Sequence, residues 1–362
     1  MPIEREQLRV LIVRLGAMGD ILHALPAVTA LRKTHPEWVL GWAVEPHWSP
    51  LLDGVDEPAD SAATIQPRGA ERPVVDRVHL AGAKGWGRRP LAPSTWSDML
   101  RLRRELRSGR YDVCLDLQGA VRSAAIGRLA RAPRMIGERQ PREAAAKWLF
   151  NERVATHGRH VIEQALEVAG AIAGERLAYV PPELPRDPVA EAWCNEWIPT
   201  SFSGRNFVLL NPGAGWGAKR WPAERYGAVA AALHGMGHGV AVNAGPGETA
   251  LAAEVVAASG GTAIAVSPTL AELIALTRRT SLVVAGDTGP LHLANALGRP
   301  VVGIFGPTDP ERNGPFGSKF RVLRHPESRR DHSRRHEPEV GLLTIPVDAV
   351  IEAAVDLLGG KG

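Results

Sequence analysis

Two strand-to-helix turns in this chain combine glycines with an aspartate. In the first, LRVLIVRL leads into GAMGD, residues 16–20; in the second, SLVVA leads into GDTGPLH, residues 286–292. Each pattern predicts an apolar strand that ends where a helix begins, so that free backbone N–H groups and a carboxylate lie together. Such turns suit a nucleotide phosphate and a reacting hydroxyl. The alternatives are a plain tight turn with Asp20 capping its helix, and a second helix capped by Asp287.

A glycine-rich segment, NPGAGWGAKRWPAERY at residues 211–226, carries a different pattern. Gly213, Ala214 and Gly215 would let backbone N–H groups approach an anion closely, and Lys219 would supply a positive charge for a phosphate. The segment therefore predicts a phosphate-binding loop. The alternative is a glycine-rich connection whose tryptophans only pack.

Two further helix starts in the second half could bind a nucleotide sugar. The segment NAGPGE ends a strand and places Glu248 where it could accept hydrogen bonds from ribose hydroxyls, or simply be stabilised by the helix dipole. In GDTGPLH, Thr288 and Gly289 present N–H groups at a predicted helix N-terminus, and His292 points back toward that end. A phosphate or a sugar hydroxyl would fit there.

Length and composition indicate a globular protein of two domains. The chain has 362 residues, 44% of them hydrophobic and 23% charged, which exceeds the usual size of one core and leaves no room for a large disordered region. Its apolar runs are shorter than the ~20 residues that span a bilayer, and MPIEREQ lacks a signal-peptide core. We therefore expect a cytoplasmic protein. Cys114 and Cys194 lack a CxxC motif or a nearby histidine pair, which argues against disulfides and zinc.

Positive charge is concentrated in one part of the chain. The formal net charge is +4, yet residues 82–160 hold 17 Lys or Arg against 7 Asp or Glu. Such a segment attracts a membrane surface, a nucleic acid or a small anionic substrate. Within it, residues 99–110 predict a helix that buries Leu100, Leu102 and Leu106 and leaves its arginines outside.

Two other basic stretches have different interpretations. Arg139, Arg142 and Lys147 cluster in an irregular stretch between elements, and we expect them to bind an anion. The segment 319–336 predicts an exposed loop, because its histidines lack the spacing of metal ligands.

Alternation of β and α patterns predicts an α/β protein with parallel sheets. A proline-rich stretch, residues 178–188, is the expected linker between the two sets. Two such domains facing each other would place the carboxyl ends of their strands on a shared cleft. The expected strands are 8–14, 38–44, 76–82, 111–117, 134–137, 207–212, 239–245, 262–266, 281–286 and 300–306, and the expected helices include 21–34, 121–130, 222–234, 247–258, 270–279, 290–297 and 346–359.

In order along nearly the whole chain, MGDILHALPA, DLQGAVRSA, AKRWP, GPGE, GDTGPLHLANALGRPVVGIFGPTDP and the closing helix resemble glycosyltransferase family 9, the ADP-heptose:lipopolysaccharide heptosyltransferases. The resemblance implies a GT-B fold of two facing Rossmann-like domains. It implies an acceptor-binding domain over residues 1–180 and a nucleotide-sugar-binding domain over residues 181–345. The closing helix, 346–362, is amphipathic, and we expect it to pack back on the first domain.

The resemblance also implies the reaction. An inverting transfer would move a heptose from ADP-L-glycero-D-manno-heptose to an anionic lipopolysaccharide precursor, Kdo-lipid A, with no metal or cofactor and with transient contact to the inner face of the cytoplasmic membrane. The motifs MGDILHALPA and DLQGAVRSA are most similar to heptosyltransferase I, which adds the first heptose to Kdo. NPGAGWGAKRWP is more similar to a pattern that heptosyltransferase II and other members share.

By the same resemblance, Asp20 would be the catalytic base and Lys219 would stabilise the departing ADP. The heptosyltransferase I pattern often has hydroxyl residues before the lysine, whereas this chain has Ala214 and Gly215, which leave only backbone contacts. The implied donor-binding residues are Ala214, Gly215, Lys219, Glu248, Asp287, Thr288, Gly289 and His292, and the implied acceptor-binding residues are Gly19, His23, Arg122, Arg142 and His160.

Two other classes of function remain as alternatives. A nucleotide-sugar epimerase can share the two-domain architecture, although it would release no ADP and need no acceptor. A binding module without catalysis could use the basic segment, but the chain has no known nucleic-acid motif and only 5% aromatic residues, so we expect no nucleic-acid partner.

Overall fold

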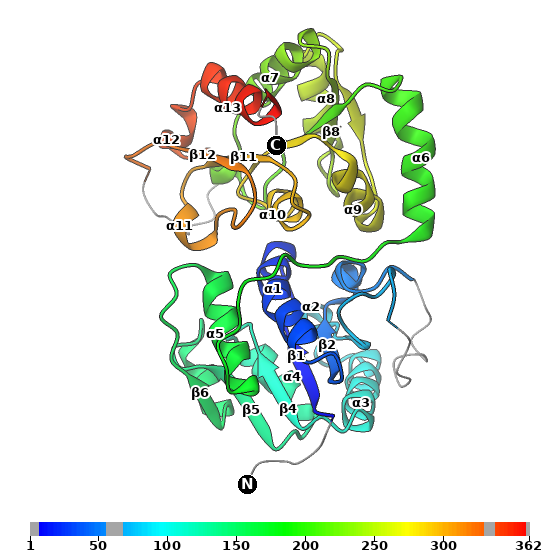
Figure 1. Ribbon diagram of the computed structural model, residues 1–362, viewed down its shortest axis with the longest axis vertical. Coiled ribbons are helices and arrows are strands. Elements are labelled where there is room, and N and C mark those ends of the chain that lie inside the picture. Colours follow the sequence, from blue (N-terminus) through cyan, green and yellow to red (C-terminus); the bar gives the residue numbers. More distant parts are fainter. Residues whose placement is uncertain (1–6, 56–67, 329–336, 360–362) are drawn as a thin grey trace. The chain divides into compact units, whose positions relative to one another are not determined.

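The computed structural model describes residues 7–55, 68–328 and 337–359. The chain folds into two compact units, Met1–Arg186 and Asp187–Gly362 (Figure 1). The division falls inside the proline-rich segment 178–188. Helix α6 (Pro188–Phe202) begins at the last residue of this segment. The Asp187 carboxylate caps it by accepting hydrogen bonds from the N–H groups of Val189 and Ala190.

The first unit is built on a parallel six-stranded sheet with the order β3-β2-β1-β4-β5-β6. Its strands are β1 (Arg9–Val13), β2 (Val39–Val44), β3 (Arg77–Leu80), β4 (Val113–Asp116), β5 (Arg134–Glu138) and β6 (Glu152–Val154). Its helices are α1 (Met18–Thr34), α2 (Ala83–Arg88), α3 (Pro93–Ser108), α4 (Val121–Leu129) and α5 (Val161–Ala173), with 3-10 turns η1 (Pro46–Leu51) and η3 (Ala144–Leu149).

The second unit repeats this plan with a parallel sheet of order β12-β11-β10-β7-β8-β9. Its strands are β7 (Phe207–Asn211), β8 (Gly239–Asn243), β9 (Ile264–Val266), β10 (Leu282–Gly286), β11 (Val301–Phe305) and β12 (Phe320–Arg324). Its helices are α6, α7 (Ala223–Gly235), α8 (Thr249–Ala258), α9 (Leu270–Arg279), α10 (Gly289–Ala296), α11 (Pro310–Asn313), α12 (Val340–Leu343) and α13 (Val347–Gly359), with a 3-10 turn η4 (Gly217–Lys219). Two parallel sheets with their connecting helices confirm the α/β class.

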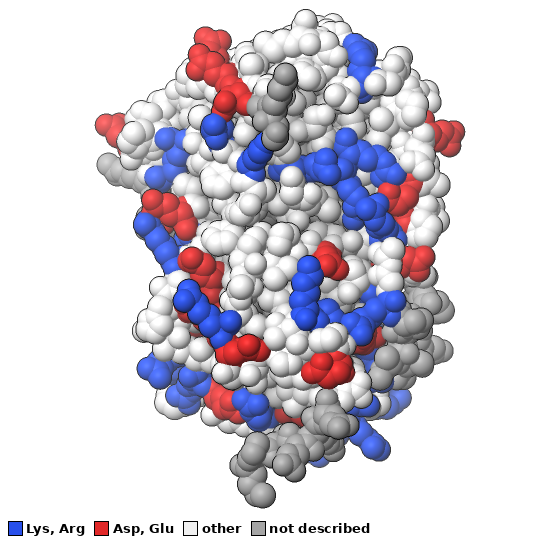
Figure 2. All heavy atoms as spheres, in the orientation of Figure 1, with Lys and Arg blue, Asp and Glu red and all other residues white. Residues whose placement is uncertain are grey.

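The basic excess of the first unit lies on its surface. Arg88, Arg104 and Arg139 are exposed, in line with the rule that charged side chains stay in water unless they are paired. On the face shown in Figure 2, Lys and Arg are interspersed with Asp and Glu. In the upper half of that view, several Lys and Arg side chains also form one contiguous group.

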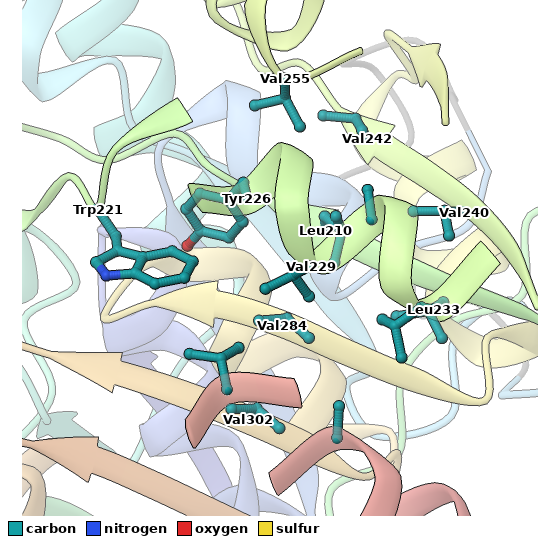
Figure 3. Packing of buried hydrophobic residues seen from close by; sticks show 14 of the residues in the cluster. Leu210, Trp221, Tyr226, Val229, Leu233, Val240, Val242, Val255, Val284 and Val302 are labelled. Carbon is teal, nitrogen blue, oxygen red and sulfur yellow. The ribbon is translucent and has the colours of Figure 1, made fainter. Parts of the chain in front are cut away.

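Both cores lie between the sheets and their helices. Every residue of β2 and β7 is buried, as expected for strands covered on both faces. In the second unit, Trp221 and Tyr226 pack edge to face at 5.1 Å beside Val229 of α7, and the strand residues Val284 and Val302 belong to the same cluster (Figure 3). This packing fixes the start of α7 directly after the glycine-rich loop.

The closing helix is part of the core of the second unit. The buried residues of α13, among them Val350, Ala354 and Leu357, belong to the core of the second unit, and the helix packs on α7, β11 and β12. Its apolar face is thus used within its own unit, and the expected packing of this helix on the first domain stays a prediction. Residues 360–362 lie outside the described part.

Two local predictions are wrong. Leu100 of α3 is 46% exposed, while Leu102 and Leu106 are fully buried, so the buried side of α3 is narrower than its leucines indicated. The expected exposed loop 319–336 begins with an edge strand, β12, whose Val322 pairs in parallel with Gly303 of β11. Residues 329–336 of that segment lie outside the described residues.

Candidate active site

The first Gly-Asp turn presents its carboxylate at the start of α1. Ala17 is the N-cap, and its N–H donates to Asp20 Oδ2 at 3.1 Å, so Asp20 satisfies a free donor of the helix start from within the first turn. The other oxygen, Oδ1, pairs with Arg14 Nη2 at 2.9 Å, and the Asp20 side chain is 39% exposed. The capping role and an accessible carboxylate are therefore both present.

The sequence did not single out Arg14, which links this turn to a second one. Its guanidinium donates to the Leu117 carbonyl, and the neighbouring Leu15 N–H donates to Gln118 Oε1 at 2.8 Å. The two segments meet because β1 and β4 pair in parallel, with Val13 opposite Asp116. The clue in the sequence was the position of Arg14, which directly follows a predicted strand and precedes a Gly-Asp turn.

Asp116, at the end of β4, holds the second turn. Its Oδ1 accepts hydrogen bonds from the N–H groups of Gln118 (2.8 Å) and Gly119 (2.7 Å), and among the described residues Oδ2 has no hydrogen-bond partner. Burial raises the pKa of Asp116 to about 6, although these N–H groups favour its ionised form. A buried carboxylate thus lies directly beside the Asp20 turn.

Three of the predicted acceptor-binding residues lie on or against α1. Gly19 is in the first turn, and His23 follows four residues later on the same face. The His23 ring lies edge to face with that of His160, with centroids 5.7 Å apart. His160 is the N-cap of α5, where its Nδ1 accepts a hydrogen bond from the Ile162 N–H at 3.2 Å. The structure brings the two histidines together, both of them buried.

The two predicted acceptor-binding arginines come from adjoining segments. Arg122 and Arg142 are both exposed. Their segments are tied together, since the Glu143 N–H donates to the Gly119 carbonyl and the Glu143 carboxylate accepts from the Val121 N–H, each at 2.8 Å. Gly119 adopts φ +65°, and a Cβ there would lie 2.9 Å from the Arg142 nitrogen, so this close approach requires glycine.

The second Gly-Asp turn holds a buried ion cluster. Asp287 follows β10, with its Oδ2 paired to Lys219 Nζ and its Oδ1 3.1 Å from His292 Nε2. Burial acts to raise the pKa of Asp287, but contacts with His292 and Lys219 hold it well below its usual range. Thr288 is the N-cap of α10, so the alternative that Asp287 caps this helix is wrong.

Lys219 stands beside an aromatic ring as well. Its Nζ lies 4.4 Å from the centroid of the Trp216 ring, and it also donates to the Asp287 carbonyl at 3.2 Å. These contacts hold the ammonium group at the end of β10, next to the N-terminus of α10. Thr288 and Gly289, the N-cap and the first residue of that helix, lie beside it as predicted.

Glu248 lies against the glycine-rich loop. It is the N-cap of α8, and its Oε2 accepts from the Gly245 N–H at 3.1 Å. A Cβ added to Gly213 would lie 2.0 Å from that same oxygen, so only glycine allows this approach. Of the next two residues, Ala214 is buried and Gly215 is exposed. The structure therefore brings together the predicted loop and the predicted ribose-binding carboxylate.

A chain of buried amides, missed by the sequence analysis, connects these loops. Asn243 Nδ2 donates to Asn211 Oδ1 at 2.6 Å, and Asn211 Nδ2 donates to Thr288 Oγ1 and to the Gly213 carbonyl, each at 3.3 Å. Both asparagines end apolar strands, β7 and β8, and a polar residue at the carboxyl end of a buried parallel strand was the clue. This chain of hydrogen bonds joins the segments that follow β7, β8 and β10.

The described ranges contain neither a cluster of metal ligands nor a membrane-spanning helix. Among residues 7–55, 68–328 and 337–359, no three His, Cys, Asp or Glu side chains are grouped in a way that could hold a metal ion. Within the same ranges no helix has the length and apolar character needed to cross a bilayer. Cys114 and Cys194 are free and buried.

Comparison with known proteins places this site in context. Residues 99–342 match the sequence profile of glycosyltransferase family 9 (heptosyltransferase). The chain is 29% identical to lipopolysaccharide heptosyltransferase 1 of Escherichia coli K12, over 88% of this chain and 94% of that protein. It is 26% identical to an E. coli lipopolysaccharide heptosyltransferase 3, over 94% of this chain and 96% of that protein.

The fold has a counterpart among solved structures. It superposes on the E. coli heptosyltransferase WaaC, determined with ADP, with a TM-score of 0.75 and 23% identity, covering 97% of this chain and 100% of that one. The protein is therefore a glycosyltransferase with the GT-B fold. Within that class, it belongs to glycosyltransferase family 9, the heptosyltransferases.

Proposed function

We propose that this protein is an inverting heptosyltransferase that moves a heptose from ADP-L-glycero-D-manno-heptose to the Kdo of the lipopolysaccharide inner core. The observation that carries the proposal is the exposed Asp20 carboxylate, held in the first turn of α1 by Arg14 and Ala17. Similarity to heptosyltransferase 1 over 88% of the chain supports the acceptor, and the ADP bound in a solved structure of the same fold supports the donor.

Asp20 acts as the general base. Inversion requires a carboxylate to take the proton from an acceptor hydroxyl while that oxygen bonds to the anomeric carbon. An exposed side chain with two fixed donors meets this need, because the carboxylate is reachable and its orientation is set. Gly19, His23 and His160 lie on or against the same helix and would contact the acceptor.

Lys219 and the start of α10 receive the leaving group. As the bond between the anomeric carbon and the diphosphate breaks, negative charge grows on ADP. The Lys219 ammonium and the N–H groups of Thr288 and Gly289 would stabilise that charge. Because these groups supply positive charge, the proposed reaction needs no metal and no cofactor, and EDTA should leave the rate unchanged.

The remaining donor contacts follow from the loops around Lys219. Glu248, fixed by the Gly245 N–H, would accept hydrogen bonds from the ribose, while Ala214 and Gly215 offer backbone groups only. The side chains of Asp287 and His292 are hydrogen-bonded to one another. We propose that they orient Lys219 and face the heptose or its phosphates.

We further propose that the protein is cytoplasmic and contacts the inner face of the cytoplasmic membrane, where an amphipathic acceptor lies. Leu91 (88% exposed) and Trp96 (56% exposed) are apolar side chains at the surface near the exposed Arg88 and Arg89, a combination that favours anionic lipid. Arg122 and Arg142 would bind the acceptor's anionic groups. Sedimentation with phosphatidylglycerol vesicles, but not with phosphatidylcholine vesicles, is the expected result.

One experiment tests the reaction. The purified protein is incubated with ADP-heptose and either Kdo-lipid A or heptosylated core, and the products are weighed by mass spectrometry. Gain of one heptose on Kdo-lipid A with release of ADP supports the proposal. Modification of ADP-heptose without an acceptor would point to an epimerase and would contradict it.

The second candidate is heptosyltransferase II, favoured by the NPGAGWGAKRWP pattern. A heptosyltransferase 2 of Salmonella typhimurium is 25% identical over 98% of this chain, so relatives with either acceptor align along most of it. In the same experiment, transfer only to the heptosylated core would select this candidate.

A further inference from the structure

Arg14 connects the proposed base to the neighbouring strand. It follows β1, and its side chain is only 14% exposed. One terminal nitrogen, Nη2, pairs with Asp20 Oδ1 at 2.9 Å, while Nη1 donates to the Leu117 carbonyl after β4. One rigid, planar guanidinium thus spans two turns of the first unit.

The contact with Arg14 completes the fixation of the Asp20 carboxylate. Oδ2 is held by the Ala17 N–H of the same turn, and Oδ1 is held by the guanidinium. Two donors on different oxygens define both the position and the plane of the group. Each carboxylate oxygen keeps a further lone pair, so a proton can still be accepted.

Arg14 is in turn held by its surroundings. Its N–H donates to the Ala43 carbonyl at 3.3 Å, and its carbonyl accepts from Trp42 Nε1 at 3.0 Å. The Leu117 carbonyl that receives the guanidinium belongs to the turn fixed by Asp116 and Gln118, and Gln118 Oε1 is bonded back to the Leu15 N–H. The strand ends, and not the helix alone, therefore determine where Asp20 lies.

We propose that Arg14 is a positioning residue for the transfer reaction, which orients Asp20 for proton acceptance and is itself anchored by the turn after β4. This inference rests on the proposed role of Asp20 as the base. An arginine suits the task, because a guanidinium does not release its proton near neutral pH and so cannot compete with Asp20 for the acceptor's proton. Its fork also reaches two acceptors at once, which a lysine ammonium does with less directional control.

The test compares Arg14→Met and Arg14→Lys with Arg9→Met as the matched control. Arg9 lies on the same strand at its other end, where its guanidinium donates to the Gly109 carbonyl at 3.0 Å. Transfer kinetics, ADP affinity and thermal unfolding are measured for each variant. We expect kcat of Arg14→Met to fall by about 100-fold, the scale of a small misplacement of a reacting group, with little change in ADP affinity. Arg14→Lys should retain part of the rate, and Arg9→Met most of it.

A rescue experiment distinguishes positioning from a structural role. Methylguanidinium added to folded Arg14→Met should restore part of kcat, whereas it should not restore Asp20→Asn. A second variant, Gln118→Leu, removes the hydrogen bond from the Leu15 N–H that ties the two turns together, without touching Asp20. It should lower kcat in the same direction by a smaller factor. Unchanged kcat in Arg14→Met, or a loss of rate without rescue that follows the loss of folded protein, would overturn the inference.

The outcomes separate the inference from the proposed function. Absence of heptose transfer by the wild-type protein overturns the proposed function and the role of Arg14 with it. Transfer by the wild-type protein together with an unaffected Arg14→Met variant overturns the role of Arg14 alone.

Discussion

The two Gly-Asp turns carry the same residue types in opposite electrostatic settings. The Asp20 side chain is 39% exposed and has one cationic partner, whereas the Asp287 side chain is 8% exposed and contacts both Lys219 and His292. A buried carboxylate paired with a lysine ammonium and hydrogen-bonded to a histidine is a poor proton acceptor, while an exposed one with a fixed orientation is available. In the proposed mechanism the motif of the first unit would therefore serve as a base, whereas the motif of the second unit anchors a cation.

Replacing the exposed carboxylate should have the largest effect. Asp20→Asn keeps the shape of the side chain and its contacts with Ala17, but it removes the proton acceptor. We expect kcat to fall by on the order of 10³-fold, with ADP affinity nearly unchanged, because general bases typically contribute about 10² to 10⁴. Transfer assays and calorimetric titration with ADP measure both quantities. Retained turnover would end the assignment of Asp20 as the base.

The matching change in the second unit should act on stability first. Asp287→Asn leaves Lys219 without its buried counter-charge, and removing one partner of such a pair costs about 3 to 5 kcal/mol. The loss should be visible in urea unfolding at pH 7. The control is Asp356→Asn, whose exposed pair with Arg321 is expected to contribute less than about 1 kcal/mol.

The pH dependence of that loss has a defined sign. Because the pKa of Asp287 is lowered in the folded state, its ionised form stabilises the fold above the unfolded value near 4, and this contribution disappears as pH falls further. The difference in the free energy of unfolding between wild type and Asp287→Asn should therefore shrink from pH 5 to pH 3. A difference that grows on acidification would show that Asp287 is not held ionised.

Removing the cation of the same cluster tests the donor side. Lys219→Met should lower donor affinity and kcat together, by about 100-fold in kcat/KM, since one preorganised charge next to a leaving group contributes about 3 kcal/mol. Lys219→Arg should retain part of the wild-type kcat/KM. Steady-state kinetics with ADP-heptose measure the loss, and an unaltered kcat/KM would remove Lys219 from the leaving-group site.

A steric prediction concerns the loop beside the anchor. Gly213→Ala places a Cβ 2.0 Å from Glu248 Oε2 and must displace that carboxylate, so donor affinity should fall about tenfold, or about 1.4 kcal/mol. In a Glu248→Ala background the same change should cost little more, which a double-mutant cycle detects. Gly215→Ala, where an added Cβ meets nothing within 4 Å, is the control for thermal stability. Additive effects of the two changes would argue against the displacement.

The last prediction concerns stability alone, at the buried carboxylate beside Asp20. The pKa of Asp116 is raised from 3.8 to about 6, so keeping it ionised at neutral pH costs up to about 3 kcal/mol. Asp116→Asn should therefore gain stability relative to wild type as pH rises from 4 to 7. Urea unfolding across that range measures the gain, with the exposed Asp98→Asn as the control.

Periodicity and turn chemistry made most of the fold predictable. The apolar runs that became β1, β2, β7 and β10 were recognisable because strands buried on both faces are continuously hydrophobic. Short or exposed elements were missed: β6 and β12 lie at sheet edges, where little burial is required and the pattern is weak. Helix α5 was missed although Ile162, Leu166 and Ala169 recur at helical spacing.

The candidate site likewise contains residues that the sequence predicted and residues that it did not. Asp20, Lys219, Glu248 and Asp287 were predicted from glycines and charges adjacent in sequence, since a turn and the helix after it are local structures. Arg14 and the Asn211–Asn243 pair were missed, because their significance depends on parallel strand neighbours that are distant in sequence. Their roles, like those of the predicted residues, stay proposals until they are tested.

The amino-acid sequence by itself determined the α/β class, the family resemblance and the two Gly-Asp turns, because hydrophobic period and backbone conformation are properties of neighbouring residues. Only the tertiary structure decided that Asp20 remains exposed beside Arg14 while Asp287 is buried between Lys219 and His292. The physical reason is that burial and ion pairing depend on which strand ends the parallel sheets bring together. That assembly makes two similar turns chemically different.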